Sequence, residues 1–173
     1  MKIIIINGSG GSGKSTFVAA AREHNSNVFE FSMVDIIKKI ALNVGWDGVK
    51  DNKGRRLLSD LKDALDRYCD KSFQYVMEDI KWIYRNNPDA IFFIHVREPK
   101  DISRWVRETN ARTLLIRRPG VEQYSNHADR NVFYYDYDYE YENKKELEQF
   151  KQDAADFVDW IEEKKWQSHI KED

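Results

Sequence analysis

The sequence predicts an α/β fold in which helices cover a mainly parallel β-sheet. Two observations carry this prediction: strand and helix patterns alternate along the whole chain, and the first strand pattern is an uninterrupted apolar run. Residues 3–6 are all isoleucine, and such β-branched runs are typical of strands that are buried on both faces of a sheet. With 173 residues and no repeat or low-complexity linker, the chain is expected to form a single domain, residues 1–173.

In the first half of the chain, two short apolar runs are interleaved with helical patterns. Ile36, Ile37 and Ile40 have helical spacing, whereas residues 43–54 are rich in turn-forming residues and predict a loop. A leucine stripe after this loop and another apolar stripe before Pro88 predict two further helices. The elements expected here are a strand at 2–6, a helix at 14–23, a strand at 28–32, a helix at 35–42, a helix through 57–68 and a helix through 73–83.

The second half continues the alternation and ends in an unusual aromatic segment. Residues 91–94 and 113–116 are apolar and predict buried strands, with a helix from Pro99 through Val106 between them. Aromatic residues alternate with polar residues over 133–141, which predicts a strand with one buried face at the edge of the sheet. The tyrosines of this strand could form a ligand surface, but core packing is the favoured interpretation. A long amphipathic helix is expected at 147–161.

Composition excludes several classes of protein. The formal net charge is −2, so no overall basic field favours nucleic acid or an anionic membrane. The single cysteine, Cys69, rules out an internal disulfide and a cysteine-based zinc site, and its place in an apolar helical stripe predicts a buried thiol. The N-terminal apolar run is too short for a signal peptide or a membrane span, so we expect a cytoplasmic protein that binds neither membrane nor nucleic acid.

A glycine-rich segment directly follows the first strand and has the pattern G-x-x-x-x-G-K-[ST]. Such a loop turns tightly and points successive N–H groups inward, and the helix that begins after it adds its dipole to an anion site. Lys14 is placed to reach the β- and γ-phosphates of a nucleotide, and the Ser15 hydroxyl is placed to ligate Mg²⁺. We therefore predict nucleoside triphosphate binding by Gly8, Ser9, Gly10, Gly11, Ser12, Gly13, Lys14, Ser15 and Thr16.

Three later segments resemble those of P-loop nucleoside monophosphate kinases, most closely the phage-type deoxynucleoside monophosphate kinases. Residues 32–38 contain a serine, an acid and a lysine after the second strand. Residues 45–58 contain Gly-Trp, then Lys-Asp, then arginine before a leucine pair, and residues 96–97 read Val-Arg after the third strand. The resemblance implies that a phosphorylated acceptor is bound by Asp35, Lys38, Trp46, Lys50, Arg55, Arg56 and Arg97.

These residues leave a second interpretation open. Asp35 and Lys38 share a helix face, so an exposed i,i+3 ion pair would explain them as well. The segment around Trp46 could be a solvated charged loop with the indole tucked against the domain. Within that segment Arg55 or Arg56 is a better phosphate ligand than a lysine, because a guanidinium fork matches a phosphate bidentately.

The chain departs from the resemblance at His95. The family's third strand ends in Asp-Val-Arg, and here a histidine stands in place of the aspartate that orders the Mg²⁺ shell. Asp35, Glu98 or Asp101 could substitute for it, or Ser15 could hold the metal together with phosphates and water. We expect His95 to be a neutral, hydrogen-bonded structural histidine, and its presence puts full catalytic activity in doubt.

The resemblance also implies a short lid at about residues 119–131. Arg117, Arg118 and Arg130 would act there as catalytic residues that neutralise charge on the transferred γ-phosphoryl group. The alternative is that Arg118 with the following proline only ends a strand. Asn143 is expected either to reach the adenine of ATP or to cap the last helix.

Taken together, the resemblance implies a three-layer α/β/α P-loop fold with a five-stranded sheet in the order 2-3-1-4-5 and an acceptor-binding insertion at about residues 35–86. The expected activity is ATP- and Mg²⁺-dependent phosphoryl transfer to a (deoxy)nucleoside monophosphate, by a monomer or homodimer. Alternatives are a kinase of another small metabolite, of the phosphomevalonate or dephospho-coenzyme A type, and a non-catalytic nucleotide-binding regulator. The acidic balance weakens a third alternative, a nucleic-acid end kinase.

Overall fold

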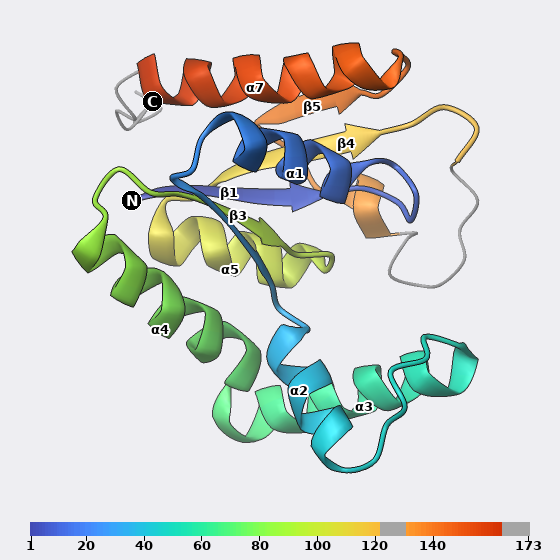
Figure 1. Ribbon diagram of the computed structural model, residues 1–173. Coiled ribbons are helices and arrows are strands. Elements are labelled where there is room, and N and C mark those ends of the chain that lie inside the picture. Colours follow the sequence, from blue (N-terminus) through green and yellow to red (C-terminus); the bar gives the residue numbers. More distant parts are fainter. Residues whose placement is uncertain (122–130, 164–173) are drawn as a thin grey trace. The chain divides into compact units, whose positions relative to one another are not determined.

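The computed structural model describes residues 1–121 and 131–163, and the chain divides into two compact units. Unit 1 comprises Met1–Glu30 and Asp89–Asp173, and unit 2 comprises Phe31–Pro88. The chain forms one five-stranded sheet in the order β2-β3-β1-β4-β5, in which β1 pairs in parallel with β3 and β4, and β4 pairs in parallel with β5 (Figure 1). The predicted α/β class and strand order are confirmed. The strands are β1 (Lys2–Asn7), β2 (Val28–Ser32), β3 (Ile91–His95), β4 (Arg112–Arg117) and β5 (Tyr139–Glu142).

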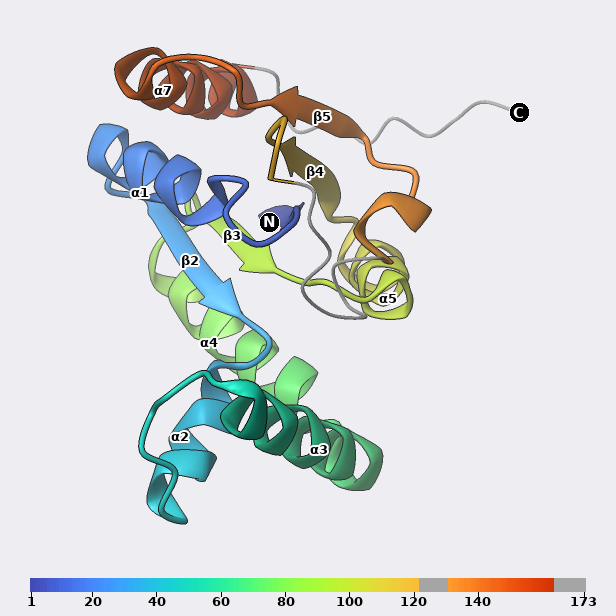
Figure 2. The ribbon, with the colours of Figure 1, turned by 90° about the vertical axis from the view of Figure 1, so that its right-hand side faces the viewer.

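Helices cover both faces of the sheet in unit 1. The helices α1 (Lys14–His24) and α7 (Leu147–Glu163) pack on one face, and α5 (Pro99–Thr109) lies on the other (Figure 2). Alternate residues of each strand point to opposite faces, and both faces of the central strands are covered, so residues 3–6, 91–94 and 114–116 are apolar and buried. The core on the α1 and α7 face includes Ile4, Ile6, Phe17, Val18, Phe93, Leu114, Ile116, Phe150 and Val158. The sheet thereby fixes the carboxyl end of β1, where the glycine-rich loop begins.

Unit 2 is helical apart from the end of β2, with α2 (Asp35–Asn43), α3 (Asn52–Cys69) and α4 (Lys71–Asn86). Ile37, Ala41 and Leu58 form its small buried cluster. The helix α3 begins inside the predicted loop 43–54, because the Asp51 carboxylate accepts the Gly54 N–H at 2.7 Å and caps the helix. Within the described residues no helix has the length and apolar character needed to cross a membrane.

The prediction of a buried Cys69 thiol is wrong, since this side chain is exposed. Cys69 is the last residue of α3, and the chain turns directly after it at Asp70, which has a left-handed backbone with φ of 53°. The apolar stripe of α3 therefore ends before Cys69: its neighbour Tyr68 is 88% exposed.

The prediction of one strand over residues 133–141 is wrong in its first half. Asn131–Tyr134 forms a 3-10 turn, and β5 begins only at Tyr139. Between the two, the Asp138 carboxylate accepts hydrogen bonds from the backbone N–H and the hydroxyl of Thr113 on β4, at 2.8 and 2.9 Å. Tyr137 points into the core and is 8% exposed. The predicted edge position of this strand is confirmed.

Candidate active site

The glycine-rich loop joins β1 to α1 in unit 1. Two of its glycines are required by close contacts as well as by their left-handed backbone. A β-carbon on Gly8, where φ is 150°, would lie 2.3 Å from the carbonyl oxygen of Ile116. A β-carbon on Gly13, where φ is 104°, would lie 2.7 Å from the side-chain nitrogen of Asn143. The loop therefore passes through spaces in which no side chain fits, and its path is fixed by β4 and by the segment before α7.

The start of α1 has the properties of an anion site. Gly13 precedes the helix and makes no side-chain cap to the N–H groups of its first turn. That turn contains no acidic residue, so no carboxylate in the turn opposes an anion. Ser15 and Thr16 are exposed at this end, whereas Ser9 and Ser12 are buried within the loop. The N–H groups at the start of a helix and the helix dipole both favour a phosphate at this position.

Lys14 folds back across the loop. Its ammonium group donates to the carbonyl oxygens of Gly8 and Ser9, at 2.6 and 2.8 Å, and lies 3.5 Å from the hydroxyl of Ser12. These contacts hold the positive charge over the concave side of the loop. Phosphate oxygens are stronger acceptors for an ammonium group than carbonyl oxygens are.

Asn143 braces the loop from the segment before α7. Its side-chain amide donates to the carbonyl oxygen of Ser12 at 3.0 Å, and its own backbone N–H donates to Arg117 at 2.6 Å. The alternative role of Asn143 as a helix cap is wrong, because α7 begins at Leu147 and the first helical acceptor is the carbonyl of Glu146. A contact of Asn143 with adenine stays a prediction.

Two of the three predicted lid arginines lie in the described residues. The Arg117 guanidinium stacks 4.9 Å from the Phe133 ring centroid and lies 3.5 Å from the carboxylate of Glu140. Its Nε is buried and has no hydrogen-bond partner among the residues that the structure describes. Arg118 is exposed. Arg130 and residues 122–130 of the predicted lid lie outside the described residues.

At the carboxyl end of β3, His95 is held by a carboxylate of the neighbouring strand. Its Nε2 lies 2.8 Å from Glu30, and the same carboxylate lies 3.8 Å from the guanidinium of Arg22 on α1. The expected hydrogen bond of His95 is confirmed. Arg97 is exposed beyond the strand end. In the described part of the chain, no group of three histidine, cysteine or carboxylate side chains could hold a metal ion.

In unit 2, Asp35 and Lys38 form the ion pair that their spacing allows. The Lys38 ammonium lies 2.7 Å from one carboxylate oxygen of Asp35, and the other oxygen accepts the backbone N–H of Ser32 at 3.1 Å. Asp35 thus fixes both the first turn of α2 and the lysine side chain. The pair does not decide between a structural role and acceptor binding.

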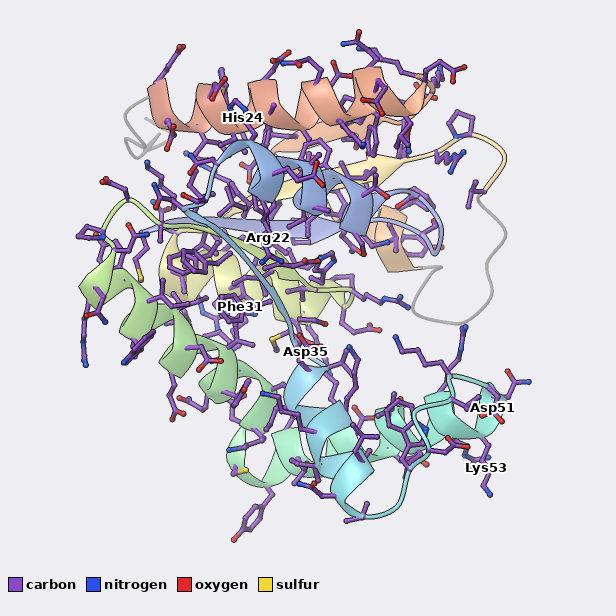
Figure 3. The ribbon with its side chains drawn as sticks, viewed as in Figure 1. Arg22, His24, Phe31, Asp35, Asp51 and Lys53 are labelled. Atoms are coloured by element: carbon purple, nitrogen blue, oxygen red, sulfur yellow. The ribbon has the colours of Figure 1, made fainter. Side chains whose placement is uncertain are left out.

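The loop before α3 and the first turns of that helix present several cations. Trp46 packs against the small core of unit 2, and its indole N–H donates to the carbonyl oxygen of Val49 at 3.1 Å. The Arg55 Nε donates to the carbonyl of Lys50 at 2.8 Å, and Arg56 is exposed. Figure 3 shows Asp51 and Lys53 at the amino end of α3. Trp46 therefore fixes the conformation of the loop. The hydrogen bond from Arg55 to the Lys50 backbone brings these two basic residues together.

Sequence reasoning missed one buried polar residue of this site. Asn7 stands between the apolar strand and Gly8, is 1% exposed, and accepts the Gly8 N–H through its side-chain oxygen at 2.8 Å. The only sequence signal was a polar residue at the end of an otherwise apolar strand. Its other partners, Arg97 and Tyr137, are remote in the sequence.

No protein-family model matches the sequence, and no curated protein matches it. Solved structures do match. A dephospho-CoA kinase from Campylobacter jejuni superposes with a TM-score of 0.56 at 16% sequence identity, over 92% of this chain and 97% of that one. A protein from Thermus thermophilus superposes with a TM-score of 0.57, also at 16% identity and over 92% and 97% of the two chains. At this level of identity the similarity shows a shared fold and nothing more.

Proposed function

We propose that this chain is a P-loop kinase that transfers the γ-phosphoryl group of ATP to a small phosphorylated acceptor. The observation that carries the proposal is the loop at Gly8–Ser15, in which the side chain of Lys14, the first residue of α1, folds back across the loop backbone. The strand order of the sheet and the similarity in fold to a dephospho-CoA kinase support a kinase over other nucleotide-binding proteins.

The glycine-rich loop and the residues beside it are proposed to bind the phosphoryl donor, ATP. Lys14 exchanges its carbonyl partners for the β- and γ-phosphate oxygens, and the N–H groups at the start of α1 bind the remaining charge. The exposed Ser15 hydroxyl fits a Mg²⁺ site completed by phosphate oxygens and water, since the metal prefers oxygen ligands. When bound, Mg²⁺ would neutralise charge on the β- and γ-phosphates. Arg117 and Arg118 are assigned to the developing charge of the γ-phosphoryl group, as is Arg130 outside the described residues.

The acceptor half is assigned to the remaining cations. A phosphate oxygen is already largely ionised near neutral pH, so the acceptor needs no dedicated general base, and catalysis consists of positioning and charge neutralisation. Arg97 is the proposed acceptor ligand of unit 1. In unit 2, the residues proposed to bind an acceptor are Lys38, Lys50, Arg55 and Arg56. A (deoxy)nucleoside monophosphate is the proposed acceptor class, on the resemblance of residues 32–38 and 45–58 to those kinases.

A second candidate acceptor is dephospho-coenzyme A. The observation that favours it is the match in fold to a dephospho-CoA kinase over most of both chains. Both acceptors carry a phosphate beside a nucleoside, so both would use the same type of cationic ligand. They differ at the reacting atom, because dephospho-coenzyme A would accept the phosphoryl group on a ribose hydroxyl, whose proton a general base must remove.

ADP production with a panel of acceptors tests the proposal. The panel contains the common deoxynucleoside and ribonucleoside monophosphates and dephospho-coenzyme A, each with ATP and Mg²⁺. We expect one acceptor class to raise ADP production well above the acceptor-free rate. Lys14→Ala should abolish it, whereas Lys151→Ala, which removes a surface lysine of α7, should not. Binding of ATP without transfer to any acceptor would instead indicate a nucleotide-binding regulator.

A further inference from the structure

The side-chain amide of Asn7 forms three hydrogen bonds, which use both of its N–H donors and its oxygen. Its oxygen accepts the Gly8 N–H at 2.8 Å, and its nitrogen donates to the Tyr137 hydroxyl at 2.7 Å and to the carbonyl of Arg97 at 3.2 Å. An amide nitrogen has two N–H donors, so these two bonds use both. The first residue of the glycine-rich loop is thereby joined to the end of β3 and to the segment before β5.

Tyr137 continues the same chain of bonds. Because its oxygen accepts the proton of Asn7, its own proton is free to donate, and it does so to the carbonyl of Val132 at 2.8 Å. Burial raises the pKa of Tyr137 to about 12, so the hydroxyl keeps this proton at neutral pH. The bonds therefore run in one direction, from Asn7 through Tyr137 to Val132.

Gly8 connects these hydrogen bonds to Lys14, because its N–H is bonded to Asn7 and its carbonyl oxygen to the Lys14 ammonium. The loop can enter by only one path there, because a β-carbon would lie 2.3 Å from the Ile116 carbonyl and 2.6 Å from the Ser12 hydroxyl. The carbonyl oxygen of Gly8 is also the nearer of the two acceptors of Lys14. A shift of Asn7 would consequently move the peptide that holds the Lys14 ammonium.

We infer that Asn7 is a positioning residue of the phosphate-binding loop and that Tyr137 acts on the loop through it. Neither residue touches the nucleotide. Asn7 fixes the Gly8 peptide, and Tyr137 fixes the orientation of the Asn7 amide. The part of this inference that concerns phosphoryl transfer rests on the proposed function, whereas the part that concerns loop geometry does not.

The test compares Tyr137→Phe, Asn7→Ala and the double variant with the unchanged chain. Tyr137→Phe removes one oxygen atom and leaves one Asn7 donor and the Val132 carbonyl without their partner. We expect a loss of about tenfold in affinity for a fluorescent ATP analogue, and a similar loss in kcat/KM for ATP, since a buried donor is left unsatisfied. The double variant should be no worse than Asn7→Ala alone, because the two residues act as one unit.

Tyr135→Phe is the matched control, because this neighbouring tyrosine contacts the Tyr137 ring edge-on but has no bond to Asn7. Tyr135→Phe should bind the ATP analogue with an affinity within about twofold of that of the unchanged chain. A purely structural role of Tyr137 would lower the melting temperature of Tyr137→Phe while leaving nucleotide affinity like that of the control, and that result overturns the inference. Independent, additive effects of Asn7→Ala and Tyr137→Phe on affinity also overturn it.

Amide hydrogen exchange separates this inference from the proposed function. In Tyr137→Phe without nucleotide, the Gly8 N–H should exchange at least several times faster than in the unchanged chain, whereas most of β1 keeps its protection. This readout needs neither ATP binding nor transfer. An unchanged chain that transfers phosphate to no acceptor contradicts the proposed function alone. An unchanged exchange rate of Gly8 in Tyr137→Phe contradicts the inference alone.

Discussion

Asn143 and Gly13 lie so close together that a β-carbon on the glycine would be 2.7 Å from the side-chain nitrogen of the asparagine. The same asparagine nitrogen donates to the carbonyl of Ser12, so it cannot withdraw without breaking a buried hydrogen bond. A third neighbour, Phe150, would lie 3.1 Å from that β-carbon. The last turn of the phosphate-binding loop is thus enclosed by the segment that leads into α7.

We therefore expect Gly13→Ala to abolish nucleotide binding and to lower the free energy of unfolding. The methyl group meets Asn143, and the left-handed backbone at Gly13 adds about 1 kcal/mol of strain for any other residue. The measurements are titration with an ATP analogue and urea denaturation. Gly10→Ala is the control, because a β-carbon at Gly10 meets no atom within 4 Å. Equal affinities of the two variants would contradict the enclosed geometry of the loop.

Ser15 is exposed in the first turn of α1, and the described residues include no cluster of three side chains that could hold a metal. If Ser15 supplies the protein's ligand to Mg²⁺, Ser15→Ala should raise the Mg²⁺ concentration for half-maximal activity by about tenfold or more. Ser15→Thr keeps the hydroxyl and should restore the value of the unchanged chain. Thr16→Ala removes the adjacent exposed hydroxyl as a control. Activity that depends on Mg²⁺ in the same way in all variants would mean that another residue is the ligand.

The path from β1 through the loop to α1 could be predicted because its information is local. Four isoleucines require a buried strand, Gly8 and Gly13 permit the turns, and Lys14 starts the helix within the same short segment. The order of the strands in the sheet could be predicted only from the resemblance to a known family, since the sequence of an apolar strand does not indicate which strand pairs with it. The sheet confirms it, with β1 between β3 and β4.

The rest of the site depends on contacts between remote segments. The alternation over residues 133–141 predicted a strand, but Tyr137 turns inward to meet Asn7 and Val132, and β5 starts after it. No local pattern could distinguish that tyrosine from those of a regular edge strand. The role of Asn7 could not be predicted for the same reason, because a single asparagine after four isoleucines does not reveal which groups it will bond.

The loop of unit 2 offers a test of the acceptor assignment. Gly54 N–H is bonded to Asp51, and a β-carbon on Gly54 would lie 2.1 Å from the carbonyl oxygen of Val49 and 2.8 Å from the indole nitrogen of Trp46. Gly54→Ala should therefore displace the segment that joins Lys50 to Arg55. The expected result is a rise of about tenfold in the acceptor KM with the KM for ATP unchanged.

Lys53→Ala provides the comparison for this loop, because it removes a neighbouring exposed charge and leaves the Gly54 contacts intact. It should change the acceptor KM by less than twofold. A Gly54→Ala variant that folds and keeps the original acceptor KM would remove this loop from the acceptor site. Circular dichroism and urea denaturation establish whether the variant folds.

Asp153 links β5 to α7 and makes the stability of unit 1 depend on pH. Its carboxylate accepts hydrogen bonds from the Tyr141 hydroxyl, from Lys145 at 2.8 Å and from Gln149 at 3.1 Å. Burial by itself raises the pKa of Asp153, but these hydrogen bonds outweigh burial and hold the pKa below its ordinary value. The folded chain therefore binds this proton less readily than the unfolded chain does.

The sign of the pH effect follows from that difference. The stabilisation by Asp153 is complete above the ordinary carboxyl pKa of about 4 and is lost as the pH falls through the lower pKa of the folded state. Asp153→Asn, which cannot ionise, should be less stable than the unchanged chain at neutral pH, and the difference in the free energy of unfolding should narrow from about pH 5 to about pH 3. Urea denaturation at a series of pH values measures the gap, with Asp156→Asn on the exposed face of α7 as the control for loss of one charge. A gap that stays constant over this range, or widens in acid, would show that the hydrogen bonds to Asp153 do not depend on its charge.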